Sequence, residues 1–171
     1  MADSMRFETL IQEYHDEIFR YLWRLTAGGG GAVADADDLT QEVFMRAYRA
    51  FPRLHAGSNH RAWLYKIATN CANTSFKQRG REAARTAILP DDLPDSARSP
   101  EQHAQQHETL ATILAALDDL PAKQRAAVIL RHLQGLDYPA IAEALDCSEE
   151  SARANVSHGI RRLRGDLAGT V

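Results

Sequence analysis

The chain has 171 residues, of which 44% are hydrophobic and 25% charged, and a formal net charge of −3. This composition suits one globular domain or two small ones. No apolar run approaches the roughly 20 residues that span a bilayer, and the N-terminus lacks the segments of a secretory signal. Cys71 and Cys147 are far apart and form no C-x-x-C motif. The sequence therefore predicts a cytoplasmic protein with reduced cysteines that pack in the interior.

Three helices are predicted in the N-terminal half. Apolar residues recur at three- and four-residue steps over 7–25, and the four consecutive glycines at 28–31 end this first helix. A second helix begins among the aspartates at 35–38, which favour the positive end of a helix dipole, and stops at Pro52. After a loop, a third helix is expected from about 61 to 79.

The composition changes between 81 and 107, where three prolines and an acidic cluster at 91–95 indicate a poorly ordered linker. Beyond it, a helical stripe of leucines and isoleucine runs to Leu120, and a further helix runs from Pro121 to Gly135. No segment has strand periodicity. We therefore predict an all-α fold of two small helical domains, at 1–80 and 108–171, joined by a flexible linker.

Positive charge is concentrated in two segments of this slightly acidic chain. Residues 43–81 contain eight basic side chains and no acidic one, and residues 151–165 contain four arginines and no acidic one. Such segments attract polyanions, above all the phosphates of nucleic acids. Solvated helix faces are the alternative explanation that charge alone leaves open.

Residues 136–163 have the pattern of a helix-turn-helix. Pro139 suits the first position of one helix, Asp146-Cys147-Ser148 form a tight turn, and Ser148 can cap a second helix. The second helix would turn its apolar positions inward and present Arg153, Ala154 and Ser157 outward, where a recognition helix enters the major groove. An ordinary helical hairpin is the alternative.

Three blocks of the sequence resemble those of bacterial sigma factors, in particular the two-domain extracytoplasmic-function class. They are DDLTQEVF at 37–44, AWLYKIATN at 62–70 and LDDLPAKQR at 117–125, the last similar to an LxxLPxxxR phrase. The resemblance covers almost the whole chain in the right order. It implies core RNA polymerase, promoter DNA and an anti-sigma factor as partners, with no cofactor and no membrane insertion of the chain itself.

The resemblance also implies roles for individual residues. The polymerase-binding face would consist of Asp38, Gln41, Glu42, Met45 and Arg46. Melting and recognition of the promoter −10 element would involve the loop at 54–60 and His60, Arg61, Lys66, Asn70, Asn73, Lys77 and Arg79, with Tyr65 nearby. The −35 element would be read by Ser151, Arg153, Ala154, Asn155, Ser157, His158, Arg161 and Arg162.

The chain departs from the family pattern at a few of these positions. Thr74 replaces an Asp or Asn, and Asn155 and His158 occupy places where relatives commonly have Arg. Each lost charge removes about one unit from the salt slope of DNA binding. We therefore expect weak intrinsic affinity for the −35 element or an unusual site preference.

Other functions were weighed against this one. An enzyme is disfavoured because the sequence has no Walker phosphate loop, no H-E-x-x-H and no nucleophile elbow, and His103 and His107 lack a third metal ligand. No catalytic or metal site is therefore expected. A stand-alone helix-turn-helix regulator would leave the N-terminal blocks unexplained. A sigma-like adaptor without promoter activity would bind polymerase but form no open complex.

Overall fold

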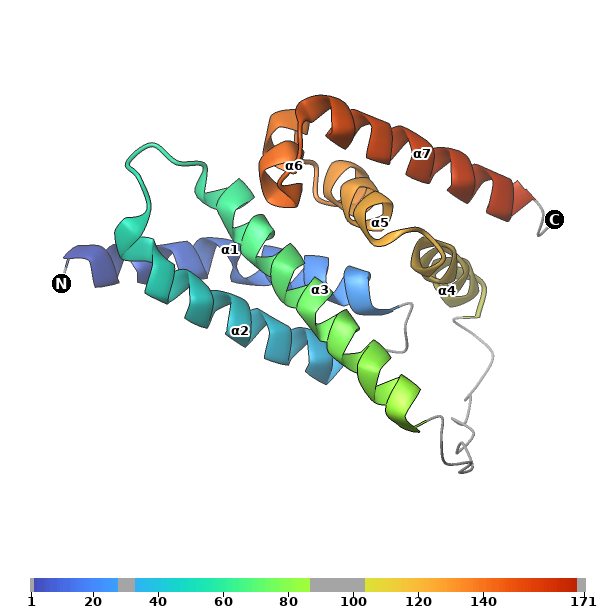
Figure 1. The fold of residues 1–171 in the computed structure, drawn as a ribbon, viewed down its shortest axis with the longest axis horizontal. Coiled ribbons are helices and arrows are strands. Elements are labelled where there is room, and N and C mark those ends of the chain that lie inside the picture. The colour runs from blue at the N-terminus through green and yellow to red at the C-terminus, as the bar shows by residue number, and fades with distance from the viewer. Residues whose placement is uncertain (1, 28–32, 87–103, 169–171) are drawn as a thin grey trace.

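The structure is a computed structural model that describes residues 2–27, 33–86 and 104–168, and every element in these ranges is helical (Figure 1). This confirms the all-α expectation. In chain order the elements are α1 (Ala2–Thr26), α2 (Val33–Ala50), the 3₁₀ turn η2 (Phe51–Arg53), α3 (His60–Thr86), α4 (Ala104–Asp118), α5 (Ala122–Val128), the π-helical turn η3 (Ile129–Leu133), α6 (Tyr138–Leu145) and α7 (Glu149–Ala168).

The N-terminal domain consists of α1, α2 and α3, which pack on each other along their apolar stripes. Ile18 and Leu22 of α1, Val43 of α2, and Leu64 and Ala68 of α3 are fully buried. Burial of each large aliphatic side chain contributes about 1.5–3 kcal/mol. This packing is the reason that three marginal helices form one stable domain.

Helix α3 extends to Thr86, beyond the expected end near residue 79. Residues 81–86 are mostly alanine, arginine and glutamate, which favour a helix, and the next proline after Pro52 comes at 90. The helix therefore includes the first six residues of the segment that was predicted to be the linker. Most of that segment, including its prolines and acidic cluster, lies outside the described residues, as do the glycines at 28–31.

The C-terminal domain consists of α4 to α7, with α6 and α7 forming the expected helix-turn-helix. The Asp137 carboxylate caps α6 by accepting from the Ala140 N–H at 3.0 Å. Asp146 takes a left-handed conformation (φ 52°) in the turn, and the Ser151 N–H donates to the Ser148 hydroxyl oxygen at 3.1 Å. The cap by Ser148 is confirmed. Pro139 is the second residue of α6 rather than the first, because Asp137 caps the helix one residue earlier.

Three positions of the expected apolar stripes are exposed: Leu110 (44%), Ile113 (38%) and Leu133 (46%). At Leu133 the cause is the π-helical turn, in which the Gln134 N–H donates to the Ile129 carbonyl at 3.0 Å. The wider turn rotates Leu133 away from the face that Ile129 shares with the core. Leu110 and Ile113 lie in α4, which contacts mainly α7.

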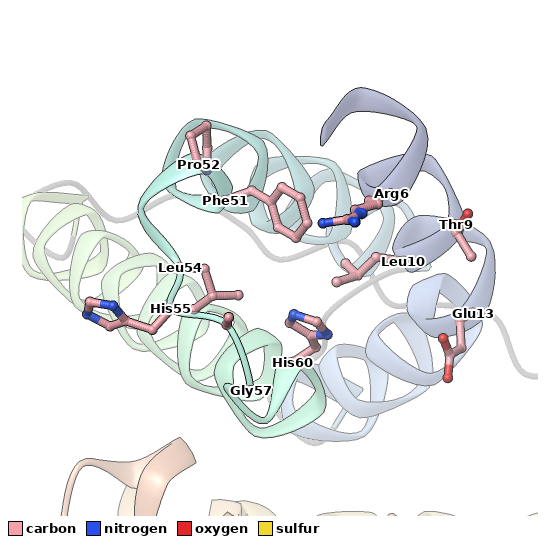
Figure 2. Close-up of a pocket in the computed structure, with 11 residues that line it drawn as sticks. Arg6, Thr9, Leu10, Glu13, Phe51, Pro52, Leu54, His55, Gly57 and His60 are labelled. Atoms are coloured by element: carbon pink, nitrogen blue, oxygen red, sulfur yellow. The ribbon is translucent and has the colours of Figure 1, made fainter. Parts of the chain in front are cut away.

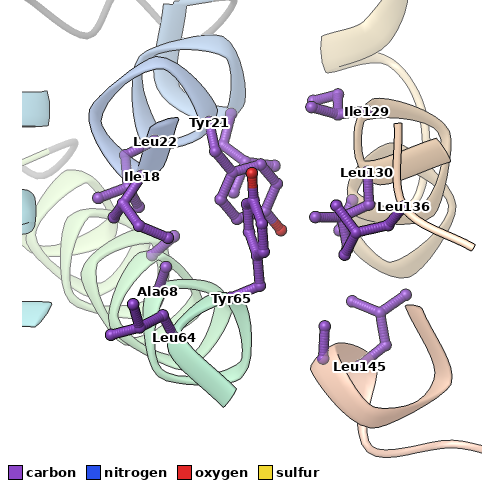
Figure 3. Close-up of a cluster of buried hydrophobic side chains, with 14 of the residues drawn as sticks. Ile18, Tyr21, Leu22, Leu64, Tyr65, Ala68, Ile129, Leu130, Leu136 and Leu145 are labelled. Carbon is purple, nitrogen blue, oxygen red and sulfur yellow. The ribbon is translucent and has the colours of Figure 1, made fainter. Parts of the chain in front are cut away.

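The two domains pack against each other, which the sequence did not indicate. Helix α3 contacts α6 as well as α1 and α2 (Figure 1). Figure 3 shows Tyr21 and Tyr65 of the N-terminal domain facing Leu130 and Leu136 of the C-terminal domain, and all four side chains are buried. One continuous apolar cluster therefore spans both domains.

Candidate nucleic-acid interface

The exposed face of α2 carries the five residues expected to bind polymerase. Asp38, Gln41, Met45 and Arg46 are exposed, and Glu42 is half-buried and pairs with Arg46. The face adjoins an apolar groove between α1 and α2. The groove is lined by Phe7, Glu8, Ile11, Gln41, Phe44, Met45, Tyr48 and Arg49.

Tyr48 extends this face, and sequence reasoning missed it. It is 57% exposed, and Met45, three residues earlier on the same helix, is 51% exposed. Large apolar side chains that stay exposed next to a groove are typical of a protein interface. The spacing of Met45 and Tyr48 within an otherwise charged face was the signal available in the sequence.

The loop before α3 encloses a pocket of about 590 Å³ with α1 (Figure 2). Leu10, Phe51 and Leu54 supply apolar walls, and Arg6 and His60 supply polar groups to the lining. The five side chains converge in Figure 2, whereas the ring of His55 points away. A planar base requires this combination of apolar surface and a few polar groups.

Local hydrogen bonds hold the loop in this shape. Gly57 has φ 84°, a conformation that favours glycine, and the Ser58 hydroxyl donates to the His55 carbonyl at 2.8 Å. The Asn59 side chain caps α3 by accepting from the Ala62 N–H at 3.0 Å. His60 was expected at this site, whereas Arg6, Leu10 and Phe51 were not.

The seven residues of α3 expected to contact the −10 element do not form one surface. His60, Asn70 and Lys77 are exposed. Asn73 and Arg79 border a cleft between the two domains, and Arg79 also pairs with Asp35 at 3.0 Å. The remaining two, Arg61 and Lys66, contact the C-terminal domain.

Arg61 is held by groups from both domains. Its Nε donates to the Glu17 carboxylate at 2.6 Å, and a terminal NH₂ donates to the Gln134 carbonyl, also at 2.6 Å. The Lys66 ammonium donates to the Asp146 carboxylate at 3.3 Å. Both cations therefore lie at the boundary between the domains rather than in an open groove.

Tyr65 was expected near the accessible side of α3, and that expectation is wrong. It is fully buried, and its hydroxyl donates to Glu17 at 2.6 Å. Burial, and then the bond to this carboxylate, raise the pKa of Tyr65 well above its usual value. Tyr65 lies one helical turn after Arg61, so both side chains are on the same face of α3. That face contacts α1 and the C-terminal domain.

Helix α7 presents the face expected of a recognition helix. Ala152, Val156 and Gly159 are buried beneath it. Asn155 is half-buried, and the other seven residues expected to contact the −35 element are exposed: Ser151, Arg153, Ala154, Ser157, His158, Arg161 and Arg162. Periodicity thus predicted the outward positions of Arg153, Ala154 and Ser157, whereas the resemblance to the family implied the other contact positions.

No group of three or more His, Cys, Asp or Glu side chains suited to a metal occurs within the part of the chain that the structure describes. His103 lies outside that part. Cys71 is buried, Cys147 is half-buried, and both are free thiols. Burial raises the pKa of the Cys71 thiol. Among the described helices, none has the length and apolar character needed to cross a membrane.

Comparison with known proteins agrees with this geometry. The family model for sigma-70 region 2 matches residues 10–82, and that for sigma-70 region 4 matches residues 110–163. The chain is 30% identical to the ECF sigma factor SigX of Bacillus subtilis, covering 92% of this chain and 81% of the relative. It is 34% identical to SigE of Mycolicibacterium smegmatis, covering 95% of this chain and 62% of that longer protein.

Solved structures show the same fold. The sigma factor RpoE of Bartonella quintana, in complex with the anti-sigma factor NepR, matches with a TM-score of 0.75 at 26% identity, over 95% of this chain and 97% of that one. The fold is also that of CnrH, with a TM-score of 0.69 at 18% identity over 98% and 91% of the two chains. The chain therefore belongs to the extracytoplasmic-function class of RNA polymerase sigma factors. Its family consists of transcription regulators that direct initiation at promoters.

Proposed function

We propose that this chain binds core RNA polymerase in the cytoplasm, directs it to a subset of promoters and catalyses no reaction itself. Residues 1–80 would bind polymerase and the −10 element, residues 81–107 would be the linker, and residues 108–171 would bind the −35 element. The observation that carries the proposal is the outward face of α7, where seven of eight expected contact positions are exposed above a buried apolar seat. That arrangement suits insertion into a major groove.

The polymerase contact is proposed for the α2 face at Asp38, Gln41, Glu42, Met45 and Arg46, extended by Tyr48. Met45 and Tyr48 supply apolar area that would be buried in the complex, and the charged residues around them supply specificity. An anti-sigma factor is the second proposed partner. The solved RpoE and CnrH structures are complexes with NepR and with the cytosolic domain of CnrY, respectively.

The −10 contact is proposed for the loop pocket and the exposed side of α3. An unpaired base would enter the pocket between Phe51 and Leu54, with Asn70 offering an amide and Lys77 a charge to the adjoining strand. Arg61 and Lys66 are held at the domain boundary. Their proposed contacts with DNA therefore require the C-terminal domain to move away from α3.

Run-off transcription by core polymerase on a pool of random promoter fragments tests the proposal. We expect transcripts only when the protein is present, from templates that share two spaced motifs. Polymerase binding in a pull-down without transcription would favour the sigma-like adaptor. DNA binding without any need for polymerase would favour the stand-alone regulator.

A further inference from the structure

The ring of Tyr138 lies beneath two guanidinium groups from different parts of the C-terminal domain. The central carbon of Arg131, in η3, is 4.6 Å from the ring centroid, and that of Arg153, in α7, is 4.2 Å from it. Tyr138 itself is the first residue of α6. The stack therefore joins the recognition helix to the two elements that support it.

Tyr138 and Arg131 are fixed by the surrounding structure. Tyr138 is half-buried and packs against the core, and the cap at Asp137 and the ring of Pro139 restrain its backbone. The Arg131 guanidinium donates to the Leu136 carbonyl at 2.9 Å. The ring thus presents a rigid surface to whatever side chain reaches it from α7.

Arg153 differs from its neighbours in the stack because it is exposed, whereas Tyr138 and Arg131 are half-buried. Its side chain is 60% exposed, and its other contact is an ion pair with Glu149 at 3.3 Å, one turn earlier on α7. An exposed arginine loses considerable rotamer freedom when it binds a partner. Contact with the ring of Tyr138 restricts that freedom in advance, and the N–H donors of Arg153 that do not bind Glu149 remain available to a partner.

We propose that Tyr138 is a positioning residue that orients Arg153 toward the promoter. The inference rests on the proposed −35 role of Arg153. Tyr138 would contact no base itself, and its effect would pass through the guanidinium that it holds. Discrimination at the base pair that Arg153 reads would therefore depend on an aromatic ring at position 138.

The test uses the full chain with core polymerase and a pool of duplex fragments in which only the upstream promoter element is randomised. Tyr138→Leu keeps an apolar side chain but removes the aromatic face, whereas Tyr138→Phe keeps the face and removes the hydroxyl. Each is compared alone and together with Arg153→Ala. Far-UV circular dichroism and thermal unfolding check that every variant folds.

We expect Tyr138→Leu to weaken binding to the preferred sequence about three- to fivefold and to reduce discrimination at one base position, with Tyr138→Phe close to wild type. In the Arg153→Ala background, Tyr138→Leu should cause no further loss, because the two changes remove the same interaction. A role in packing alone would give equal losses in both backgrounds.

The outcomes separate this inference from the proposal on which it rests. If Arg153→Ala weakens selection but Tyr138→Leu does not, or if Phe fails to restore it, the positioning role is wrong and the −35 role stands. If Arg153→Ala changes neither affinity nor base preference, both are overturned. Failure of the wild-type protein to select any sequence would overturn the proposed function as well.

Discussion

Gly159 lies where α7 packs against α5. Its replacement by alanine therefore tests how closely the two helices approach each other. A Cβ atom at this position would lie 2.5 Å from Cγ2 of Val128 and 3.4 Å from the Gln124 carbonyl oxygen. The first distance is well inside van der Waals contact. Val128 is 4% exposed, and its branched side chain has one strongly preferred rotamer in a helix, so it cannot turn aside easily.

Two opposing effects set the size of the change. Overpacking of a buried site costs about 1–3 kcal/mol, whereas replacement of a helical glycine by alanine contributes about 0.8–1 kcal/mol in favour of folding. For Gly159→Ala we therefore expect a net loss of about 1 kcal/mol in the free energy of unfolding. In a protein of this size that corresponds to a fall in Tm of about 2–4 °C.

Gly165→Ala is the matched control. It is the same chemical change in the same helix, but a Cβ there meets no atom within 4 Å. We expect it to stabilise the protein by up to about 1 kcal/mol. Urea unfolding followed by far-UV circular dichroism would compare the two. Stabilisation of similar size at both positions would refute the close contact between α5 and α7.

Other expectations concern function and pH. Asn70→Ala should impair transcription from duplex promoters but spare fully melted templates; equal loss on both would contradict a role in opening. Arg161→Ala should weaken binding to all sequences alike and lower the salt slope of the holoenzyme by about one unit, and an unchanged slope would contradict a phosphate contact. Met45→Ala should weaken binding to core polymerase about tenfold in a fluorescence titration, and unchanged affinity would exclude Met45 from the interface. Burial raises the pKa of Tyr21 and Tyr65 above their ordinary value. The contribution of the two buried, protonated tyrosines to the free energy of unfolding is therefore complete below about pH 10. It is lost as the pH rises further, because the unfolded chain then releases the phenolic protons whereas the folded protein retains them. Urea unfolding across that range should show the loss, and Tyr21→Phe should reduce it.

Helical periodicity was sufficient to predict the fold class and the inward faces of α2 and α7, whereas in α3 it missed the burial of Tyr65. Ala152 and Val156 are buried as expected because steps of four place them on one side of a helix. Helix ends were harder to predict. Nothing in residues 81–86 opposes a helix, so α3 reaches Thr86 rather than ending near residue 79.

The candidate site was less predictable, because its parts depend on contacts that are distant in sequence. The loop pocket combines Arg6 of α1 with Phe51 and His60, about 45 to 54 residues away by their numbering. Arg61 and Lys66 have the pattern of solvated helix positions, and only the packing of the second domain brings them to a boundary. Periodicity distinguishes inward from outward within one domain but carries no information about which outward face another domain covers.

The polar contacts near the domain boundary are of two kinds: some lie within the N-terminal domain, and others join the two domains. Only the second kind would be lost if the domains moved apart. Glu17, Arg61 and Tyr65 all belong to the N-terminal domain, so the bonds from Arg61 and Tyr65 to Glu17 do not cross between the domains. Opening would break the bond from Arg61 to the Gln134 carbonyl and the Lys66–Asp146 pair. The Asp146 side chain is 83% exposed, and a pair of this kind contributes at most about 1 kcal/mol. Opening would in addition expose the apolar surfaces that Tyr21 and Tyr65 share with Leu130 and Leu136. Any partner that holds the domains apart has to cover those surfaces, while Arg61 stays oriented by Glu17 throughout.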